Sequence, residues 1–278
     1  MLFASTNLVA RIEEAECGLL ADSIDVVLRR DPGTGPFVIP LAGGIATFSA
    51  PGSPLNKVAG LGFAGPLDEG ALAAVEEAFA ERGSPVQVEI ATLADPSIGQ
   101  KLTARGYVLQ GFENVLGRSL PVEHEAPRAP SVEILPSPLS ELSAWIDVVV
   151  TGFASPDAQG VPSHESFPRE LIEGIMRDMA STGGFSRYLA RRDGVIAGGA
   201  SMRLAKGVAQ LCGAATLPEH RRRGVQSALL SARLEIATKA GCDVAVVTTQ
   251  PGSKSQENVQ RQGFELLYTR AVLVRSPS

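Results

Sequence analysis

In the second half of the chain, an apolar run is followed by apolar residues at helical spacing. From Val225 to Ala240 the apolar residues recur at spacings of three and four, which places one apolar stripe on a helix. An apolar run from Val208 to Thr216 precedes this helix, and a proline and a basic, glycine-bearing turn lie between them. The pattern therefore predicts a strand, a basic loop and a helix in direct succession.

The loop carries three consecutive arginines, Arg221, Arg222 and Arg223, followed by Gly224. The first backbone N–H groups of a helix have no intrahelical partner, and the helix dipole is positive at that end. Such a turn binds anions before any side chain is considered, and a glycine lets a bulky anion approach the backbone. The loop therefore predicts an anion site, and the expected ligand is a pyrophosphate.

These residues resemble the acyl-CoA loop of the GNAT superfamily of N-acyltransferases, whose signature is Gln/Arg-x-x-Gly-x-Gly/Ala after the fourth strand. Arg221, Gly224 and Gln226 occupy the three signature positions. Gln226 replaces the usual glycine or alanine, but the contact there uses a backbone N–H, which glutamine also has. An ordinary helix opened by a solvated basic loop is the alternative interpretation of the same residues.

The chain also contains an internal repeat. A shift of 157 residues places Val86–Arg118 on Asp243–Arg275 without a gap. Gly106-Tyr107 then meets Gly263-Phe264, with apolar strand residues matched on both sides of this turn. Chance similarity between two strand-helix-strand segments is the alternative. We predict two copies of one fold in tandem, an arrangement that is known in the superfamily.

Three prolines and the lack of hydrophobic periodicity mark residues 121–130 as a linker between domains at 1–120 and 131–278. At the helix start where the second copy has its arginines, the first copy has Asp68 and Glu69. Negative side chains suit the helix dipole but repel a pyrophosphate. The first domain is therefore predicted to be a degenerate GNAT-like copy, and the second to be the acetyltransferase domain.

The resemblance implies an α/β (α+β) fold in which each domain is a mixed, mostly antiparallel twisted sheet flanked by helices. Its fourth and fifth strands are expected to part over the acyl-CoA. The patterns in the second domain predict the following elements: helices over 139–153 and 168–180, the latter capped by Ser166; a meander of strands with a tight turn at Asp193-Gly194; a strand over 244–249; a short helix near 255–261; and a closing pair around 264–274.

The resemblance also implies which residues bind the acyl-CoA. In the family, the acyl carbonyl and pantetheine arm bond to the backbone of the fourth strand, and the loop holds the pyrophosphate. The matching residues are Ala214, Ala215, Thr216, Arg221, Arg222, Arg223, Gly224, Val225, Gln226 and Ser227. Because backbone groups make these contacts, ordinary strand and helix roles stay open for the side chains of Thr216 and Ser227.

The usual proton-transfer groups of the family are missing. Its general acid is typically a tyrosine four residues before the Gly-Phe turn, where this chain has Val259, and the fifth strand has no carboxylate. Possible substitutes are Tyr268, Cys212, and His164 with its neighbour Glu165. Each also has a structural interpretation: a half-buried aromatic, a small hydrophobe, or solvated loop residues. Positioning alone can supply much of the rate when an amine attacks a thioester.

Composition narrows the functional class. Of the 278 residues 44% are hydrophobic and 20% are charged, which is typical of a soluble globular protein, and the net charge of −5 opposes duplex DNA as a partner. The three cysteines and three histidines lack the spacing of disulfide frameworks or metal sites. No apolar run is long enough to cross a bilayer, and no signal-peptide pattern is present. We expect a cytoplasmic protein without metal, nucleic-acid or membrane partners.

These observations predict an acetyl-CoA-dependent N-acetyltransferase that transfers an acetyl group to the amine of a small molecule by direct attack. The alternative is a non-catalytic acyl-CoA-binding sensor or an interaction protein, which the missing acid and base and the degenerate first copy favour. Turnover of acetyl-CoA with a panel of amines distinguishes the two hypotheses.

Overall fold

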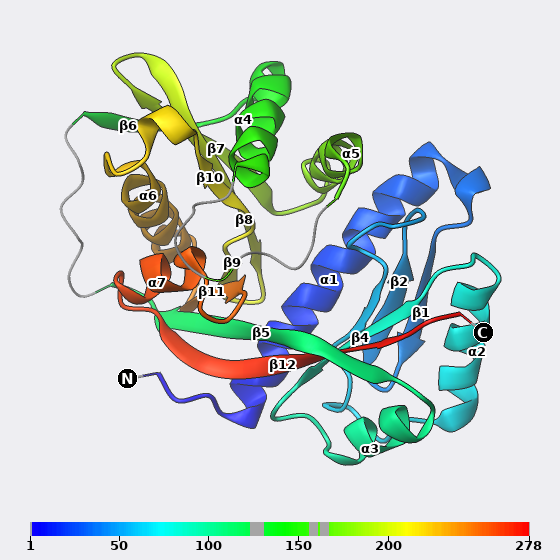
Figure 1. Cartoon of the computed structure of the whole chain (residues 1–278). Helices are drawn as coiled ribbons and strands as arrows, with labels where there is room; N and C mark the ends of the chain where they lie inside the picture. The colour runs from blue at the N-terminus through cyan, green and yellow to red at the C-terminus, as the bar shows by residue number, and fades with distance from the viewer. Residues whose placement is uncertain (1, 123–130, 156–160, 162–166, 278) are drawn as a thin grey trace. The chain divides into compact units, whose positions relative to one another are not determined.

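The chain forms two compact units (Figure 1). The computed structural model describes residues 2–122, 131–155, 161 and 167–277. The N-terminal unit comprises Phe3–Val115 together with Leu266–Ser278, and the C-terminal unit comprises Met1–Leu2 together with Leu116–Glu265. Each unit is a mixed, mostly antiparallel sheet with helices packed on it, which confirms the predicted fold class.

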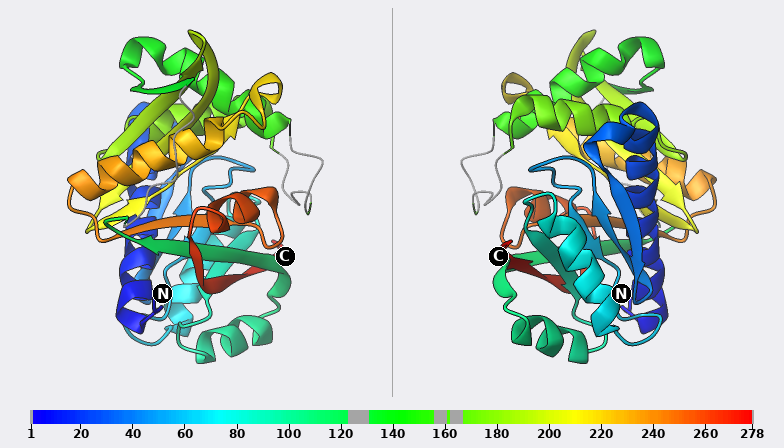
Figure 2. Two further views of the ribbon diagram at one scale, coloured as in Figure 1. Left: turned by 90° about the vertical axis from the view of Figure 1, so that its left-hand side faces the viewer. Right: turned by 90° about the vertical axis from the view of Figure 1, so that its right-hand side faces the viewer.

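The sheet of the N-terminal unit has the strand order β1-β2-β3-β4-β12. The pairs β1–β2, β2–β3 and β4–β12 are antiparallel, and β3–β4 is parallel. Helix α1 lies along one face and α2 along the other (Figures 1 and 2). The elements are α1 (Thr6–Arg30), β1 (Phe37–Leu41), β2 (Gly44–Phe48), β3 (Lys57–Ala59), α2 (Glu69–Ala80), β4 (Val86–Ala91), α3 (Ser97–Ala104), the start of β5 (Val108–Ser119), and β12 (Glu265–Arg275).

The sheet of the C-terminal unit has the strand order β11-β9-β8-β7-β6, and β10 also pairs with β8. Strands β9 and β11 are parallel, whereas β6–β7, β7–β8, β8–β9 and β8–β10 are antiparallel. The elements are β6 (Val132–Pro136), α4 (Leu142–Ala154), α5 (Arg169–Met179), β7 (Phe185–Arg192), β8 (Val195–Ala205), β9 (Val208–Gln210), β10 (Ala214–Thr216), α6 (Val225–Lys239), β11 (Val244–Thr249) and α7 (Lys254–Gln260).

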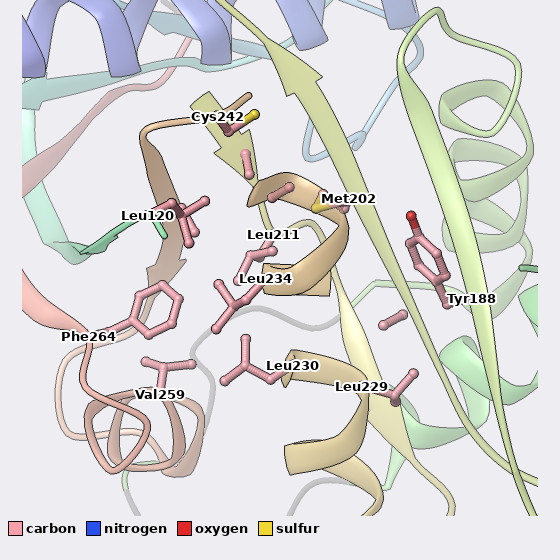
Figure 3. Packing of buried hydrophobic residues seen from close by; sticks show 14 of the residues in the cluster. Leu120, Tyr188, Met202, Leu211, Leu229, Leu230, Leu234, Cys242, Val259 and Phe264 are labelled. Carbon is pink, nitrogen blue, oxygen red and sulfur yellow. The ribbon is translucent and has the colours of Figure 1, made fainter. Parts of the chain in front are cut away.

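Strand β7 shows how alternating side chains divide the core of the C-terminal unit. Tyr188 and Ala190 point to one face and pack in the cluster that contains the apolar stripe of α6, whereas Leu189 points to the other face and packs with α4. Figure 3 shows the α6 side of this core, where Leu230 and Leu234 lie beside Val259 and Phe264. The two faces therefore place α6 and α7 on one side of the sheet and α4 and α5 on the other.

The internal repeat is visible in the element boundaries. The shift of 157 residues places β3 on β10, the first residue of α3 on the first residue of α7, and the first residue of β5 on the first residue of β12. The glycines of the two Gly-aromatic turns also share a left-handed backbone, with φ of 85° at Gly106 and 78° at Gly263. The tandem arrangement of two GNAT-like copies is thus a property of the structure as well as of the sequence.

The compact units differ from the predicted limits of 1–120 and 131–278 in their last strands. Strand β12 pairs with β4, and Leu273, which lies opposite Val88, is buried in the core of the N-terminal unit. Strand β5 passes out of that unit at Val115, and Leu116 and Leu120 are buried in the core of the C-terminal unit. Each copy therefore supplies its closing strand, wholly or in part, to the core of the other.

Two expectations about strands need correction. The single strand predicted over 208–216 is two strands, because the chain departs from a regular ladder at 211–213, and the closing pair predicted around 264–274 is the single strand β12. The tight turn at Asp193-Gly194 is confirmed, with φ of 53° and 79°. Residues 123–130 of the predicted linker and the predicted cap Ser166 lie outside the described residues.

Two features are absent from the described residues. No helix in this part of the chain is long and apolar enough to cross a membrane. No group of His, Cys, Asp and Glu side chains within the same ranges is arranged to hold a metal ion.

Candidate functional site

The start of α6 has the geometry of an anion site. Gly224 is its N-cap, with the left-handed φ of 79°, and no side chain of a described residue caps the helix. Arg222, two residues earlier, also has a positive φ, of 60°. The N–H groups of the first turn therefore lack a capping side chain from the described residues. The backbone conformation at position 224 is one that glycine adopts more easily than any residue with a β-carbon.

The equivalent helix of the N-terminal unit is closed by its own carboxylate. Asp68 is the N-cap of α2, and its Oδ1 accepts a hydrogen bond of 2.7 Å from the backbone N–H of Ala71. Glu69 adds a second negative charge in the first turn. An anionic ligand would have to compete with these groups, so the two helix starts differ in the way that the sequence predicts.

The strands next to the loop diverge. Strands β9 and β11 pair from Val208 to Gln210, and the N–H of Leu211 still donates to the carbonyl of Val246 at 2.9 Å. Beyond this point β10 pairs with β8, while β11 continues to Thr249 without pairing with β10. The backbone edge of β10 is therefore open on the side of β11, which agrees with the expected parting of the fourth and fifth strands.

A cavity of about 640 Å³ lies between these elements. Its walls are the end of α4, the strand β10, the loop with the first turn of α6, and one face of α7. Helix α4 reaches β10 closely because Gly152 has no side chain: a β-carbon there would lie 2.4 Å from that of Ala215. All ten residues predicted to bind the acyl-CoA except Arg223 line this cavity.

The three arginines of the loop have different positions. Arg221 donates from Nη2 to the carbonyl of Ser155 at the end of α4, which ties the loop to that helix, and it also lines the cavity. Arg222 is exposed and lines the cavity, whereas Arg223 is exposed and does not line it. Arg222 is therefore the loop arginine most available to an anion in the cavity.

Two polar atoms in the wall lack a protein partner. The buried atoms Oγ1 of Thr216 and Nδ1 of His220 make no hydrogen bond within the described part of the chain, and both residues line the cavity. Buried polar groups are normally satisfied, so such atoms are expected where a ligand completes the site. Together with the open helix start and the open strand edge, they fit a ligand that has both an anionic end and hydrogen-bonding groups.

Comparison with known proteins supports this interpretation. Residues 153–264, which include the loop, the diverging strands and α7, match the family described as "Acetyltransferase (GNAT) family". These residues belong to the GNAT family. No curated protein matches the chain.

Solved GNAT structures share the fold across both units. A GCN5-related N-acetyltransferase from Kribbella flavida is 18% identical, has a TM-score of 0.62, and matches over 94% of this chain and 95% of that chain. A tandem GNAT protein from the clavulanic acid biosynthesis pathway is 13% identical, with a TM-score of 0.61 and the same coverage. A GCN5-related N-acetyltransferase from Sphaerobacter thermophilus is 16% identical, with a TM-score of 0.54 over 74% of this chain and 66% of that chain.

The candidate acid Tyr268 lies in the other compact unit from the GNAT loop. Tyr268 is 3% exposed in the N-terminal unit, and its hydroxyl donates to Oε1 of Glu13 at 2.5 Å. Burial, followed by the negative charge of Glu13, raises its pKa well above the usual value of a phenol. Arg270 binds the same carboxylate oxygen at 2.8 Å, so the structure gives Tyr268 a place in a buried ion-pair network.

Of the other two candidates, the structure describes only Cys212. Cys212 is half-buried in the irregular segment between β9 and β10, where its Sγ lies 3.5 Å from the carbonyl of Gln210, and it does not line the cavity. His164 and Glu165 lie outside the described residues. Val259, at the family's usual tyrosine position, is 5% exposed and packs with Phe264 in the core (Figure 3).

Sequence reasoning missed several residues of the GNAT cavity. Ser255 and Asn258 of α7 and its C-cap Arg261 recur at spacings of three, so a polar face on the predicted short helix was the available signal. Phe153 and Gly152 come from α4, and only packing brings them to the loop. Arg233 of α6 does not line this cavity, but it is buried although it carries a charge.

Proposed function

We propose that the chain is an N-acetyltransferase that transfers the acetyl group of acetyl-CoA to the amine of a small molecule. The observation that carries this proposal is the juxtaposition of the uncapped start of α6 with the open edge of β10 in one cavity. The family and fold support acyl transfer from an acyl-CoA in general; the acetyl group and the amine acceptor are the finer parts of the proposal.

The chain's own groups then have distinct tasks. Backbone N–H groups of Val225, Gln226 and Ser227, with Arg222, hold the pyrophosphate, and the backbone of β10 orients the pantetheine arm. The amine attacks the thioester carbonyl, a C–N bond forms, and the C–S bond breaks to release the CoA thiolate. The ammonium proton passes to water, and the thiolate takes a proton from water. Orientation of the two reactants supplies the main part of the rate.

Only the C-terminal unit is proposed to bind acetyl-CoA. The carboxylate of Asp68 already accepts the helix-start hydrogen bond in the N-terminal unit, whereas the corresponding position in α6 is Gly224 without a capping side chain. Calorimetric titration of the full chain is therefore expected to give one acetyl-CoA site per chain. A stoichiometry of two would contradict the asymmetric assignment.

The test of activity is turnover of acetyl-CoA by the full chain with a panel of primary amines. Release of the free thiol and the mass of the acetylated amine are measured together, because thiol release alone also reports hydrolysis. Thiol release matched by acetylated amine is the expected result. Gly224→Trp serves as the matched variant, since it fills the approach to the loop without removing a charge.

A non-catalytic acyl-CoA sensor is the second candidate. Two observations favour it: Val259 is a core residue, and no Asp or Glu lines the cavity within the described part of the chain. Tight acetyl-CoA binding with no amine acetylated across the panel is the result that would favour the sensor over the enzyme.

A further inference from the structure

A second chamber, of about 350 Å³, adjoins the cavity at the loop. The two share wall residues from β10, the first turn of α6 and α7, including Ala214, Ser227 and Asn258. The chamber extends further along α6, between the apolar side chains of Leu211, Leu230 and Val247. Any molecule held at the loop with its reactive end between the diverging strands therefore ends in or beside this chamber.

One wall of the chamber is a buried arginine. Arg233 lies nine residues after Gly224, which is two and a half turns along α6, and it is 2% exposed. Its Nε donates to the carbonyl of Leu229 at 3.1 Å, and its Nη1 donates to the carbonyl of Ser201 at 2.9 Å. Two neutral carbonyls thus hold the guanidinium in place without neutralising it.

The guanidinium keeps donors available toward the chamber. Nη2 makes no hydrogen bond to any described residue, and Arg233 forms no ion pair within that part of the chain. A guanidinium has five N–H donors, and the planar group suits a carboxylate in a bidentate arrangement. The remaining donors can therefore bind a ligand that enters the chamber.

The electrostatic setting of the chamber also favours an anionic ligand. Burial lowers the pKa of Arg233 to about 10, so the side chain remains charged at neutral pH. Arg261 also lines the wall, but its charge is paired with Glu257, so Arg233 is the lining cation that has no carboxylate partner among the described residues. A buried, unpaired charge is costly, and a negative group on a ligand would offset that cost.

We propose that the Arg233 chamber binds a carboxylate carried by one of the two reacting molecules, either on the acyl group of the donor or on the amine acceptor. This proposal rests on the function proposed above, because the chamber continues the cavity assigned to acetyl-CoA. The pyrophosphate is not the ligand of Arg233, since it is held at the start of α6, two and a half turns away.

The test compares matched substrates that differ in one carboxylate. One arm uses succinyl-CoA and butyryl-CoA as donors with a single amine, and the other uses acetyl-CoA with amino acids and the corresponding decarboxylated amines. In one of the arms, the carboxylate is expected to raise kcat/KM by about 10- to 100-fold, the usual range for one charge-assisted hydrogen-bonded contact. The arm that responds identifies which molecule carries the group.

Variants connect this preference to the residue. Arg233→Met is expected to abolish the preference, while Arg233→Lys keeps part of it because the charge remains. Arg203→Met is the matched control, since Arg203 is also a buried arginine of this unit but does not line the chamber. The control is expected to keep the full preference even if its stability falls.

Binding measurements separate this proposal from the activity. If no amine is acetylated, succinyl-CoA should still bind more tightly than butyryl-CoA, or an amino acid should bind the CoA complex more tightly than its decarboxylated amine. Equal use and equal binding of both members of every pair would overturn the proposal. So would a preference that persists unchanged in a folded Arg233→Met protein.

Discussion

Arg222 and Arg223 offer a direct test of how the loop binds its anion. The two residues are adjacent, both are exposed, and both are arginines, but only Arg222 lines the cavity. Replacing each with alanine removes the same charge from the same loop. Arg222 has a φ of 60°, but alanine and arginine both carry a β-carbon there, so the backbone cost is common to the wild type and the variant.

The size of the expected effect follows from the exposure of the side chain. A hydrogen bond to a charged group contributes about 1.5–3 kcal/mol, but exposed ion pairs contribute only about 0.2–1 kcal/mol. Arg222 lies between these cases because a bound pyrophosphate would cover it on one side. We therefore expect Arg222→Ala to weaken acetyl-CoA binding by about 1–2 kcal/mol, which is about 5- to 30-fold. Arg223→Ala should change the affinity less than about threefold.

Calorimetry at several salt concentrations checks both numbers. Arg222→Ala should also reduce the salt dependence of binding, because one fewer cation meets the pyrophosphate. A short acetyl thioester without pyrophosphate, such as S-acetyl-N-acetylcysteamine, is the control substrate, and the two variants should use it equally well. The reasoning would be refuted if the two alanine variants lost affinity equally, or if Arg223→Ala lost more.

Three further outcomes are expected. Gly224→Trp should reduce the acetyl-CoA affinity measured by calorimetry at least about 100-fold, while the circular dichroism spectrum remains native. The side chain blocks the approach to the helix start, and a bulky residue is strained at a φ of 79°. An unchanged affinity would mean that the anion binds elsewhere. Tyr268→Phe should lower the free energy of unfolding, measured in urea, by about 1–2 kcal/mol, because it removes the hydrogen bond to Glu13. Turnover should change little. A fall in kcat of about 100-fold without loss of stability would instead identify Tyr268 as the acid. Burial and then the charge of Glu89 raise the pKa of Glu113 to about 7, so its contribution to stability is present below pH 4.5 and is lost as pH rises to 7. The stability of Glu113→Gln relative to the wild type should therefore rise between pH 5 and pH 8. The upper limit of this rise is about 3 kcal/mol, and the 29% exposure of the side chain reduces it. Parallel pH profiles of the variant and the wild type would exclude this effect.

Local sequence signals were sufficient to predict the start of α6 and its difference from the start of the equivalent helix α2. The apolar stripe of α6, the glycine before it and the arginines beside it predict an anion site, and Asp68 and Glu69 predict a closed helix start in the other copy. Both predictions depend on contacts within a few residues, where capping and backbone conformation are decided by the residues themselves. The repeat was also visible, because the same turn and the same alternation recur in one register.

Only the tertiary structure decided which strands and side chains meet across long distances. The segments β5 and β12 have the same pattern, so the sequence does not distinguish the core that each one completes; the burial of Leu273 with Val88 and of Leu116 in the other unit makes that choice. The same packing brings Tyr268 to Glu13, 255 residues away. It also buries Arg233, whose position on a helical face predicts no more than a solvated charge. Alternation along a strand or helix determines which side chains share a face, whereas the partner of that face depends on how the two copies fill their cores.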